Sequence, residues 1–222
     1  MMEELIAQLP KTDAFIQHFL PNFTNWLPFY WKNFQQTTRY TYRLAIDDPD
    51  AVYRHFSDKT RYKIRKANKI VTVREDLSAE QFHDVHQMTF DRQGLPTPFS
   101  LDLFLKFDKA LEQHDARKMF FAVDQDQNIH SALYIIIDKE IAYMHFLGSN
   151  PTFRKSESVN FLYWHVIQYL TEQRGIYLID FQGSMMKNVE NIFRRLRATQ
   201  VPYFSITQDN SRLFKWIQQI KN

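Results

Sequence analysis

The stretch that decides the fold is KMFFAVDQDQNIHSALYIIIDKEIAYMHFLGSN, residues 118–150. Three runs rich in β-branched and aromatic residues are separated there by DQDQN at 124–128 and by DKE at 138–140. Short polar segments between such runs are typical of hairpin turns. We therefore predict three successive antiparallel strands in the middle of the chain.

Helical and strand patterns alternate after this meander, which predicts an α/β second half. The expected elements are a helix over 159–172, a strand over 176–181, a helix over 187–196, a strand over 202–206 and a helix over 212–220.

The chain before the meander is mostly helical in pattern. A capping box of Ser78 and Gln81 predicts the start of a helix that ends near Gly94, and Ser100 begins the next. Ser57 or Asp58 is a suitable cap for the basic helix inside 50–68. Further expected elements are helices over 3–9 and 13–20 and strands over 40–46 and 71–75.

Composition narrows the class of protein. The 222 residues include 20 Phe, 11 Tyr and 4 Trp, which favours one packed globular core over a disordered chain. Without cysteine, thiol nucleophiles, disulfides and cysteine-bound metals are excluded. The acidic start MMEELIAQLP is unlike a secretory signal, and the apolar runs are too short to span a bilayer. We expect a cytoplasmic protein without membrane insertion.

Several strings resemble the GNAT superfamily of N-acetyltransferases, and within it the Fem-type peptidoglycan aminoacyltransferases. They are WLPFYWKNFQQTTRYTYRL at 26–44, RYKIRKANK at 61–69, TFDRQGLPTPFS at 89–100 and DFQGSM at 180–185. The resemblance implies a GNAT-like α/β (α+β) fold, in which a mixed, mostly antiparallel sheet has helices on both faces.

The resemblance also suggests a domain division. Larger Fem-type proteins contain two GNAT-like halves, whereas 222 residues accommodate one. We therefore interpret 1–38 as a lead-in that is the remnant of a missing first half, and 39–222 as the GNAT-like domain. In the larger proteins the acceptor lies in a cleft between the two halves. A homodimer in which a second subunit supplies the missing side of that cleft is a hypothesis.

The cofactor that the resemblance implies is acetyl-CoA or another acyl-CoA, whose pyrophosphate binds backbone N–H groups at a helix start. Arg154 matches the first position of the GNAT turn pattern, but Glu157 stands where glycine is expected. An ordinary helix start with an acidic first turn is the alternative. The expected cofactor-binding residues are Phe146, Leu147, Gly148, Arg154, Ser156 and Ser158.

Two further segments are expected to bind substrate. Six basic residues within 59–69, Arg61 and Arg65 among them, suit the phosphates of a tRNA, a nucleotide-linked precursor or a coenzyme, and a solvated helix face is the alternative. Arg92 and Gln93 lie in a loop where GNAT domains grip the acceptor, and a purely architectural turn is the alternative. At the end of the strand over 176–181, Asp180, Gln182 and Ser184 are placed for substrate.

Amine acylation requires a base for the amine and an acid for the leaving group. Tyr143 and His145 alternate on the third meander strand, so both are expected on one face. We predict His145 as base, Tyr143 or Tyr203 as acid, and Asp180 as a further catalytic residue; buried core positions are the alternative. His83 and His86 lack a third ligand at a recognisable spacing, so no metal site is expected.

Taken together, the sequence predicts an N-acyltransferase. It would move an acyl or aminoacyl group from acyl-CoA or aminoacyl-tRNA to an amine on a small molecule, a peptide or a cell-wall precursor. One rival is an inactive GNAT-fold binding module, because Glu157 and Arg197 occupy positions where GNAT enzymes usually have glycine. The other is an RNA-binding accessory protein that uses the basic helix 59–69.

Overall fold

The computed structural model describes residues 2–10, 12–46, 48–173, 175–183, 185 and 187–210. The chain forms two compact units, one built from its beginning up to Thr41 together with its end from Gln200, and the other from Tyr42–Thr199. The expected segment 39–222 is therefore divided between the units. The interpretation of 1–38 as a remnant of a missing half stays a prediction.

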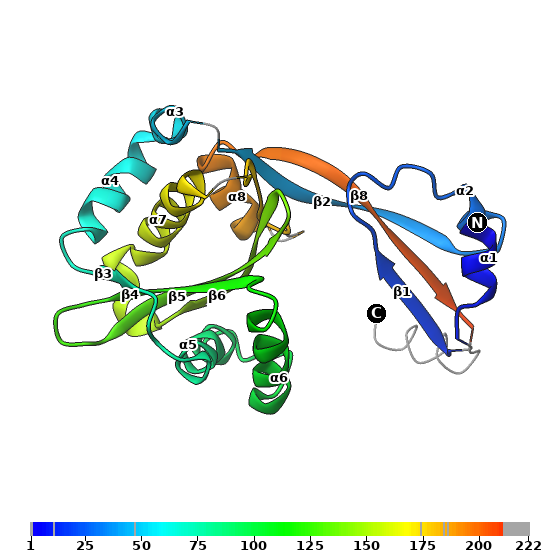
Figure 1. Ribbon diagram of the computed structural model, residues 1–222, viewed down its shortest axis with the longest axis horizontal. Coiled ribbons are helices and arrows are strands. Elements are labelled where there is room, and N and C mark those ends of the chain that lie inside the picture. Colours follow the sequence, from blue (N-terminus) through cyan, green and yellow to red (C-terminus); the bar gives the residue numbers. More distant parts are fainter. Residues whose placement is uncertain are drawn as a thin grey trace. The chain divides into compact units, whose positions relative to one another are not determined.

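The larger unit contains the predicted GNAT-like elements (Figure 1). In chain order these are α3 (Pro49–His55), α4 (Asp58–Ala67), β3 (Thr72–Arg74), α5 (Ala79–Asp91), α6 (Leu101–Glu112), β4 (Arg117–Val123), β5 (Ile129–Asp138), β6 (Ile141–Ser149), the 3₁₀ helix η1 (Pro151–Ser156), α7 (Ser158–Glu172), β7 (Leu178–Asp180) and α8 (Lys187–Arg195). The end of β2 (Gln35–Ala45) also belongs to this unit.

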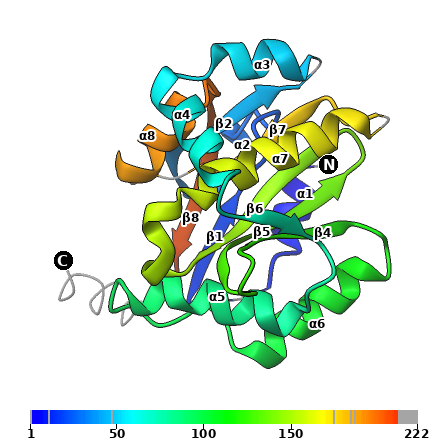
Figure 2. The ribbon, with the colours of Figure 1, turned by 90° about the vertical axis from the view of Figure 1, so that its left-hand side faces the viewer.

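The predicted meander is confirmed. β4 pairs antiparallel with β5, and β5 with β6, while β7 pairs parallel with β6. The strand order of this unit is β2-β7-β6-β5-β4-β3, a mixed and mostly antiparallel sheet. Helices α4 and α7 cover one face of the meander and α5 and α6 cover the other, as Figure 2 shows. The predicted fold class is confirmed.

Burial on both faces explains why β4 is apolar without alternation. Met119 through Val123 are all buried, with Phe120 packing in the core beside α7 and Phe121 in the core beside α5 and α6. Each buried phenylalanine contributes about 1.5–3 kcal/mol of burial free energy. The sheet is thus held between two separate hydrophobic cores.

Local signals fix the helix starts as the sequence predicts. The Oγ of Ser57 accepts the backbone N–H of Thr60 at 3.2 Å, so Ser57 is the cap of α4. Both halves of the Ser78 and Gln81 capping box are present at α5. These caps satisfy N–H groups that would otherwise lack partners at the helix ends.

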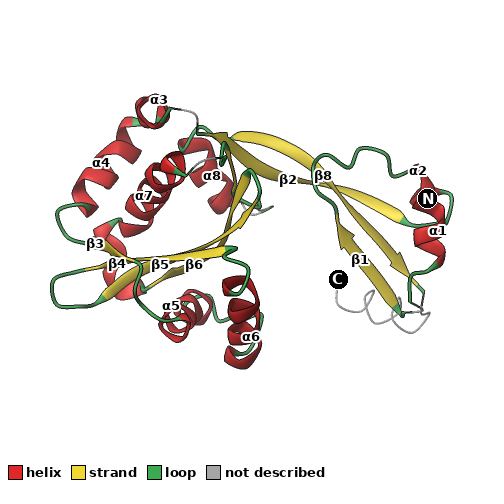
Figure 3. Ribbon diagram, in the orientation of Figure 1, coloured by secondary structure: helices red, strands yellow, loops and turns green. Residues whose placement is uncertain are grey.

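Among its described residues, the smaller unit contains three strands and two short helices, coloured by type in Figure 3. These are α1 (Met2–Ala7), β1 (Ala14–His18), α2 (Leu27–Tyr30), the beginning of β2 and β8 (Thr199–Asp209), with strand order β1-β8-β2. Its core contains Ile6, Phe29, Phe34 and Ile206.

The helix predicted over 13–20 is wrong. Residues 14–18 form β1, which pairs antiparallel with β8 from Ala14 opposite Asp209 to His18 opposite Ser205. Pairing with a strand far along the chain overrides the local pattern. The helix expected over 212–220 lies outside the described residues.

Gly148 lets β6 approach α5 closely. A Cβ at Gly148 would lie 2.8 Å from the backbone nitrogen of His86 and 2.9 Å from the carbonyl carbon of Val85. Contacts of this length with rigid backbone cannot be relieved by a side-chain rotation. The strand end is therefore seated directly on the helix backbone.

We predict that Gly148→Ala lowers the free energy of unfolding by about 1–3 kcal/mol, because α5 has to move off the strand. Urea unfolding followed by circular dichroism measures the change. Ser149→Ala, on the next residue of the strand, is the control and is expected to lie within about 0.5 kcal/mol of the parent. A Gly148→Ala protein as stable as the parent would contradict the close approach.

Candidate functional site

β6 changes its pairing at His145. Tyr134 of β5 lies opposite Phe146, while the next residue, Ile135, lies opposite Met144, so His145 is an extra residue in the ladder. An extra residue of this kind reverses the alternation of side chains beyond it. Accordingly Met144 packs in the core beside α7, whereas Phe146 packs in the core with α5 and α6.

β6 also leaves β7 at this point. The two strands pair only from Ile141 opposite Leu178 to Tyr143 opposite Asp180. The rest of β6, up to Ser149, has no partner strand on its β7 side among the described residues. The sheet splays here, and at the end of β6 the backbone N–H of Ser149 donates to Thr89 Oγ1 at 2.9 Å.

Four predicted residues meet where the strands separate. The Nδ1 atom of His145 lies 2.9 Å from the Oε1 atom of Gln182. The backbone N–H of Gln182 donates to Asp180 Oδ1 at 2.8 Å, and Asp180 lies opposite Tyr143 in the ladder. Asp180 is buried and its Oδ2 accepts a hydrogen bond from Arg43 Nε at 2.8 Å.

The surroundings shift the pKa values of His145 and Tyr143 in directions that suit a base and an acid. Burial lowers the pKa of His145 below its ordinary value, and the hydrogen bond with Gln182 offsets part of that shift. Burial, with the negative charges of Asp180 and Asp138, raises the pKa of Tyr143. At neutral pH this cluster therefore contains a neutral imidazole and a protonated phenol.

A basic pocket of about 300 Å³ lies beside the end of β6. Four cationic side chains line it together with the carboxylate of Glu157. The cations come from α4, the residue after α5, η1 and α8, and are Lys63, Arg92, Arg154 and Arg195. Leu147 and Ser158, both predicted from the GNAT pattern, also line the pocket. This excess of positive charge suits an anionic ligand.

The turn into α7 has the backbone shape of the GNAT pattern with a different side chain. Glu157 adopts a left-handed conformation with φ of 62°, which glycine tolerates and which costs another residue about 1–2 kcal/mol. Arg197, the other residue found where glycine is expected, is also left-handed, with φ of 60°. At both positions the backbone is left-handed, as glycine readily allows, but a side chain covers the backbone that glycine would leave exposed.

Coenzyme A does not fit this turn. The carboxylate of Glu157, the residue before α7, lies 2.8 Å from Lys63 Nζ and caps no helix N–H group, so a negative group stands beside the helix start. The backbone N–H of Ser158 donates to Ser156 Oγ at 3.4 Å, and that of Glu157 donates to the Arg154 carbonyl at 3.4 Å. A pyrophosphate would meet a like charge and N–H groups that already have partners.

The basic helix α4 is only partly available to a ligand. Lys63 pairs with Glu157, and Lys66 Nζ donates to the Lys155 carbonyl at 2.6 Å. Arg61 donates to the Arg54 carbonyl at 2.8 Å and pairs with Asp58, whereas Arg65 is exposed. Ile64, Ala67 and Val71, on the face of this segment opposite to solvent, are buried. Much of the positive charge thus attaches α4 to the turn before α7.

Other predicted residues lie apart from the pocket. Gln93 Nε2 donates to the Thr89 carbonyl at 2.8 Å, at the end of its own helix. Phe146 is packed among the rings of α5 and α6, and Ser156 is buried. Tyr203 lies on β8 in the smaller unit, with its ring 6.2 Å from that of His18. Ser184 lies outside the described residues.

The two histidines of α5 are core residues. His83 and His86 are 6% and 4% exposed, and the ring of His86 stacks on Phe99 at 5.4 Å. Within the part of the chain that the structure describes, no three acidic or histidine side chains gather in a way that could hold a metal ion.

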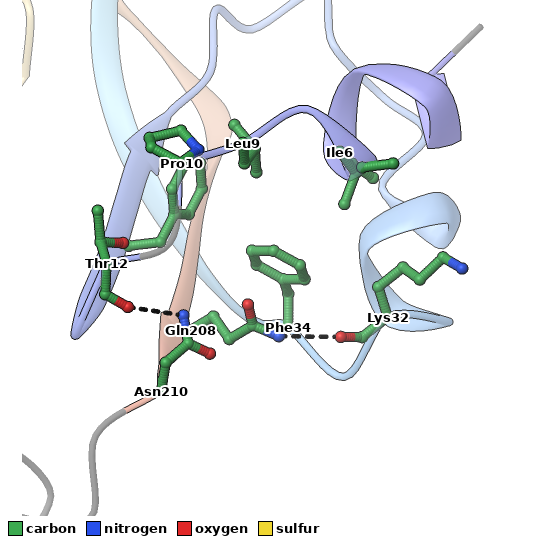
Figure 4. Close-up of a pocket in the computed structure, with 10 residues that line it drawn as sticks. Ile6, Leu9, Pro10, Thr12, Lys32, Phe34, Gln208 and Asn210 are labelled. Atoms are coloured by element: carbon green, nitrogen blue, oxygen red, sulfur yellow. Dashed lines mark hydrogen bonds between the residues drawn. The ribbon is translucent and has the colours of Figure 1, made fainter.

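A second hollow, of about 310 Å³, lies in the smaller unit (Figure 4). Its wall includes Ile6, Leu9 and Phe34, and hydrogen bonds of 3.0 Å join Gln208 to the Lys32 carbonyl and Asn210 to the Thr12 carbonyl. None of the residues predicted from the sequence to be functional lines it.

Sequence reasoning missed two residues of the site, and it included Lys63 only as one of the six basic residues within 59–69. The two are Arg195, which reaches the basic pocket from α8, and Arg43, which reaches Asp180 from β2. Each contact joins residues far apart in the chain, so no spacing rule could identify them. Basic residues inside the strings that resemble the Fem type were the one available signal.

Comparison with known proteins agrees with this geometry at the level of the fold. FemX shares 13% identity with a TM-score of 0.67, over 80% of this chain and 67% of FemX. L-PGS from Bacillus licheniformis shares 11% identity with a TM-score of 0.55, over 88% of this chain and 68% of that protein. A protein of unknown function from Staphylococcus epidermidis shares 12% identity with a TM-score of 0.52, over 89% and 73%.

A search of curated proteins finds no match to this chain. The likeness to FemX and L-PGS confirms the resemblance to the Fem-like branch as a likeness of fold. Among the described residues, no helix is both long and apolar enough to cross a bilayer. The sequence of residues 54–190, more than half of the chain, matches the acetyltransferase (GNAT) domain, so the chain belongs to the GNAT family of acyltransferases.

Proposed function

We propose that this protein transfers an aminoacyl group from an aminoacyl-tRNA to an amine acceptor. The observation that carries the proposal is the basic pocket of Lys63, Arg92, Arg154 and Arg195, in which Glu157 takes the place that a coenzyme pyrophosphate would need. The family supplies the reaction class, acyl transfer, and the pocket argues for the kind of carrier.

The charges of the pocket favour an RNA end over coenzyme A. Cations that come from four separate elements can contact successive phosphodiesters along a strand, each of which has a single negative charge. A pyrophosphate instead concentrates its charge on one helix start, where Glu157 repels it. The exposed Arg65 adds a further positive charge on α4.

The cluster at the splay provides the acid and the base for amide formation. The neutral acceptor amine attacks the carbonyl carbon of the aminoacyl ester, and His145 accepts the proton that the nitrogen loses as the amide forms. The new C–N bond forms as the ester C–O bond breaks, and Tyr143 donates its proton to the leaving ribose oxygen. The proton held by His145 returns to Tyr143 through solvent, so the enzyme ends as it began.

An inactive GNAT-fold binding module is the second candidate, and the left-handed Glu157 and Arg197 favour it. Such a module would bind RNA at the pocket without transferring the aminoacyl group. Transfer from acyl-CoA, the RNA accessory role, the homodimer, the cytoplasmic location and the roles of Tyr203 and Ser184 stay predictions. The acceptor class stays an amine on a small molecule, peptide or cell-wall precursor.

We predict that the protein transfers labelled amino acids from a pool of aminoacylated tRNAs to amines in a panel of acceptors. Mass spectrometry of the acceptors detects the transfer. Arg195→Ala should lower kcat/KM about tenfold and reduce the slope of log affinity against log salt by about one. Arg194→Ala is the matched control, because Arg194 is its neighbour on α8 and pairs with Glu190.

Tight RNA binding without any transfer would support the binding module instead. Affinity that does not weaken as salt rises, or that is equally reduced by both arginine variants, would contradict the assigned pocket.

We further predict that coenzyme A does not stabilise the parent protein, whereas Glu157→Gln and especially Glu157→Gly gain saturable stabilisation. Removing the carboxylate removes the repulsion, and glycine also opens the backbone of a turn that is already left-handed. Thermal shift against coenzyme A concentration measures the effect, with an expected gain in affinity of about tenfold or more. Glu172→Gln, at the other end of α7, is the control.

An equal shift in the parent and in the Glu157 variants, including no shift in any of them, would contradict the role of Glu157 as the obstacle.

A further inference from the structure

Gln182 presents a hydrogen-bond acceptor to one nitrogen of His145. Its Oε1 atom lies 2.9 Å from Nδ1 of the imidazole. An amide oxygen only accepts hydrogen bonds, so Nδ1 has to carry the proton in this pair. The other nitrogen, Nε2, is then left with its lone pair and can act as an acceptor.

The backbone of Gln182 is held in a conformation that few side chains adopt. Its φ is 55°, in the left-handed region, between the end of β7 and Gly183. The N–H of Gln182 donates to Asp180 Oδ1 at 2.8 Å, which closes a tight turn two residues long. This turn sets where the Gln182 side chain begins and thus the direction in which it reaches His145.

Asp180 is in turn fixed by Arg43. The Arg43 Nε atom donates to Asp180 Oδ2 at 2.8 Å, and the carboxylate is 4% exposed. Arg43 and Asp180 are also opposite each other in the β2–β7 ladder, so the side-chain contact is supported by backbone pairing. The two carboxylate oxygens therefore have different partners, one from β2 and one from the turn.

The His145 ring is confined from a second side. It lies against Phe107 of α6 with ring centroids 5.7 Å apart and planes 25° from parallel. The extra residue in the β5–β6 ladder is His145 itself, so its backbone position is set by the bulge. Stacking fixes the plane of the ring, and the contact with Gln182 fixes the position of its Nδ1 edge.

We propose that Arg43, Asp180 and Gln182 are positioning residues that hold His145 as its Nδ1–H tautomer, with Nε2 facing the acceptor amine. This inference rests on the proposed function for the direction of proton transfer. It assigns Gln182 to orienting the base rather than to binding substrate, and it makes Asp180 a support of that orientation. Arg43 acts through Asp180, with which it forms an ion pair.

The titratable groups around His145 do not obscure its behaviour. His86 of α5 is buried and its pKa is lowered to about 4 by burial and by His83 and His145, so it is neutral near pH 7. Tyr143 of β6 is protonated there, since its pKa is raised. The buried Asp180 on β7 forms an ion pair with Arg43.

The test is nitrogen-15 NMR of the histidine side chains in the protein without ligand, with the His145 signals assigned by His145→Gln. We expect Nδ1 of His145 to be protonated and Nε2 unprotonated, although free histidine prefers the opposite tautomer. Gln182→Leu should return His145 to the Nε2–H tautomer, and Arg43→Gln should shift the mixture in the same direction. Gln168→Leu, an exposed glutamine on α7, is the matched control and should change nothing.

Gln182→Glu provides a second readout. A carboxylate beside Nδ1 should raise the pKa of His145 by about one unit or more. It should also keep the Nδ1–H tautomer, which Gln182→Leu loses. The acid limb of kcat/KM should move to higher pH by the same amount. In Gln182→Leu, kcat should fall about tenfold or more with little change in KM.

An Nε2–H tautomer in the parent protein, or a tautomer that Gln182→Leu leaves unchanged, would overturn the proposal whatever the activity. The expected tautomers together with a protein that transfers no aminoacyl group would instead contradict the proposed function and leave the positioning in place.

Discussion

The extra residue at His145 in β6 is the constraint on which the rest of the site depends. It reverses the faces of the strand, so Phe146 enters the core with α5 and α6 while Met144 stays in the core beside α7. It coincides with the point where β6 leaves β7. One local irregularity thus places the candidate base, opens the sheet edge and leads the strand toward the basic pocket.

The second determinant is the ion pair between Glu157 and Lys63. It joins the turn before α7 to the basic helix α4 and places a carboxylate at a helix start that would otherwise attract anions. Glu157 has a left-handed backbone where the family pattern has glycine, and its side chain brings a carboxylate to that position. The other cations of the pocket are Arg92, Arg154 and Arg195.

Much of the fold follows from local sequence patterns. Turn residues at 124–128 and 138–140 determine the meander, and Ser57, Ser78 and Ser100 begin their helices where the pattern predicts. The helix predicted over 13–20 was wrong because Ala14–His18 pairs with β8, at the opposite end of the sequence. No local window contains that partner.

The site was less predictable than the fold for the same reason. Alternation identified Tyr143 and His145, and the end of a strand identified Asp180 and Gln182, all of which meet. Lys63 with Glu157, and Arg43 with Asp180, are contacts between distant segments that only the folded chain brings together. Phe146 was expected beside a cofactor from the family resemblance, and nothing in the sequence indicates the bulge that places its ring in the core with α5 and α6.

The most direct test of the account is the binding of a fluorescent tRNA acceptor-stem mimic that has an amide-linked, non-hydrolysable amino acid at its 3′ end. Fluorescence anisotropy should show binding that weakens with salt and that millimolar coenzyme A does not displace. Displacement of the RNA by coenzyme A, in proportion to its concentration, would contradict the conclusion that the basic pocket selects an RNA-borne donor.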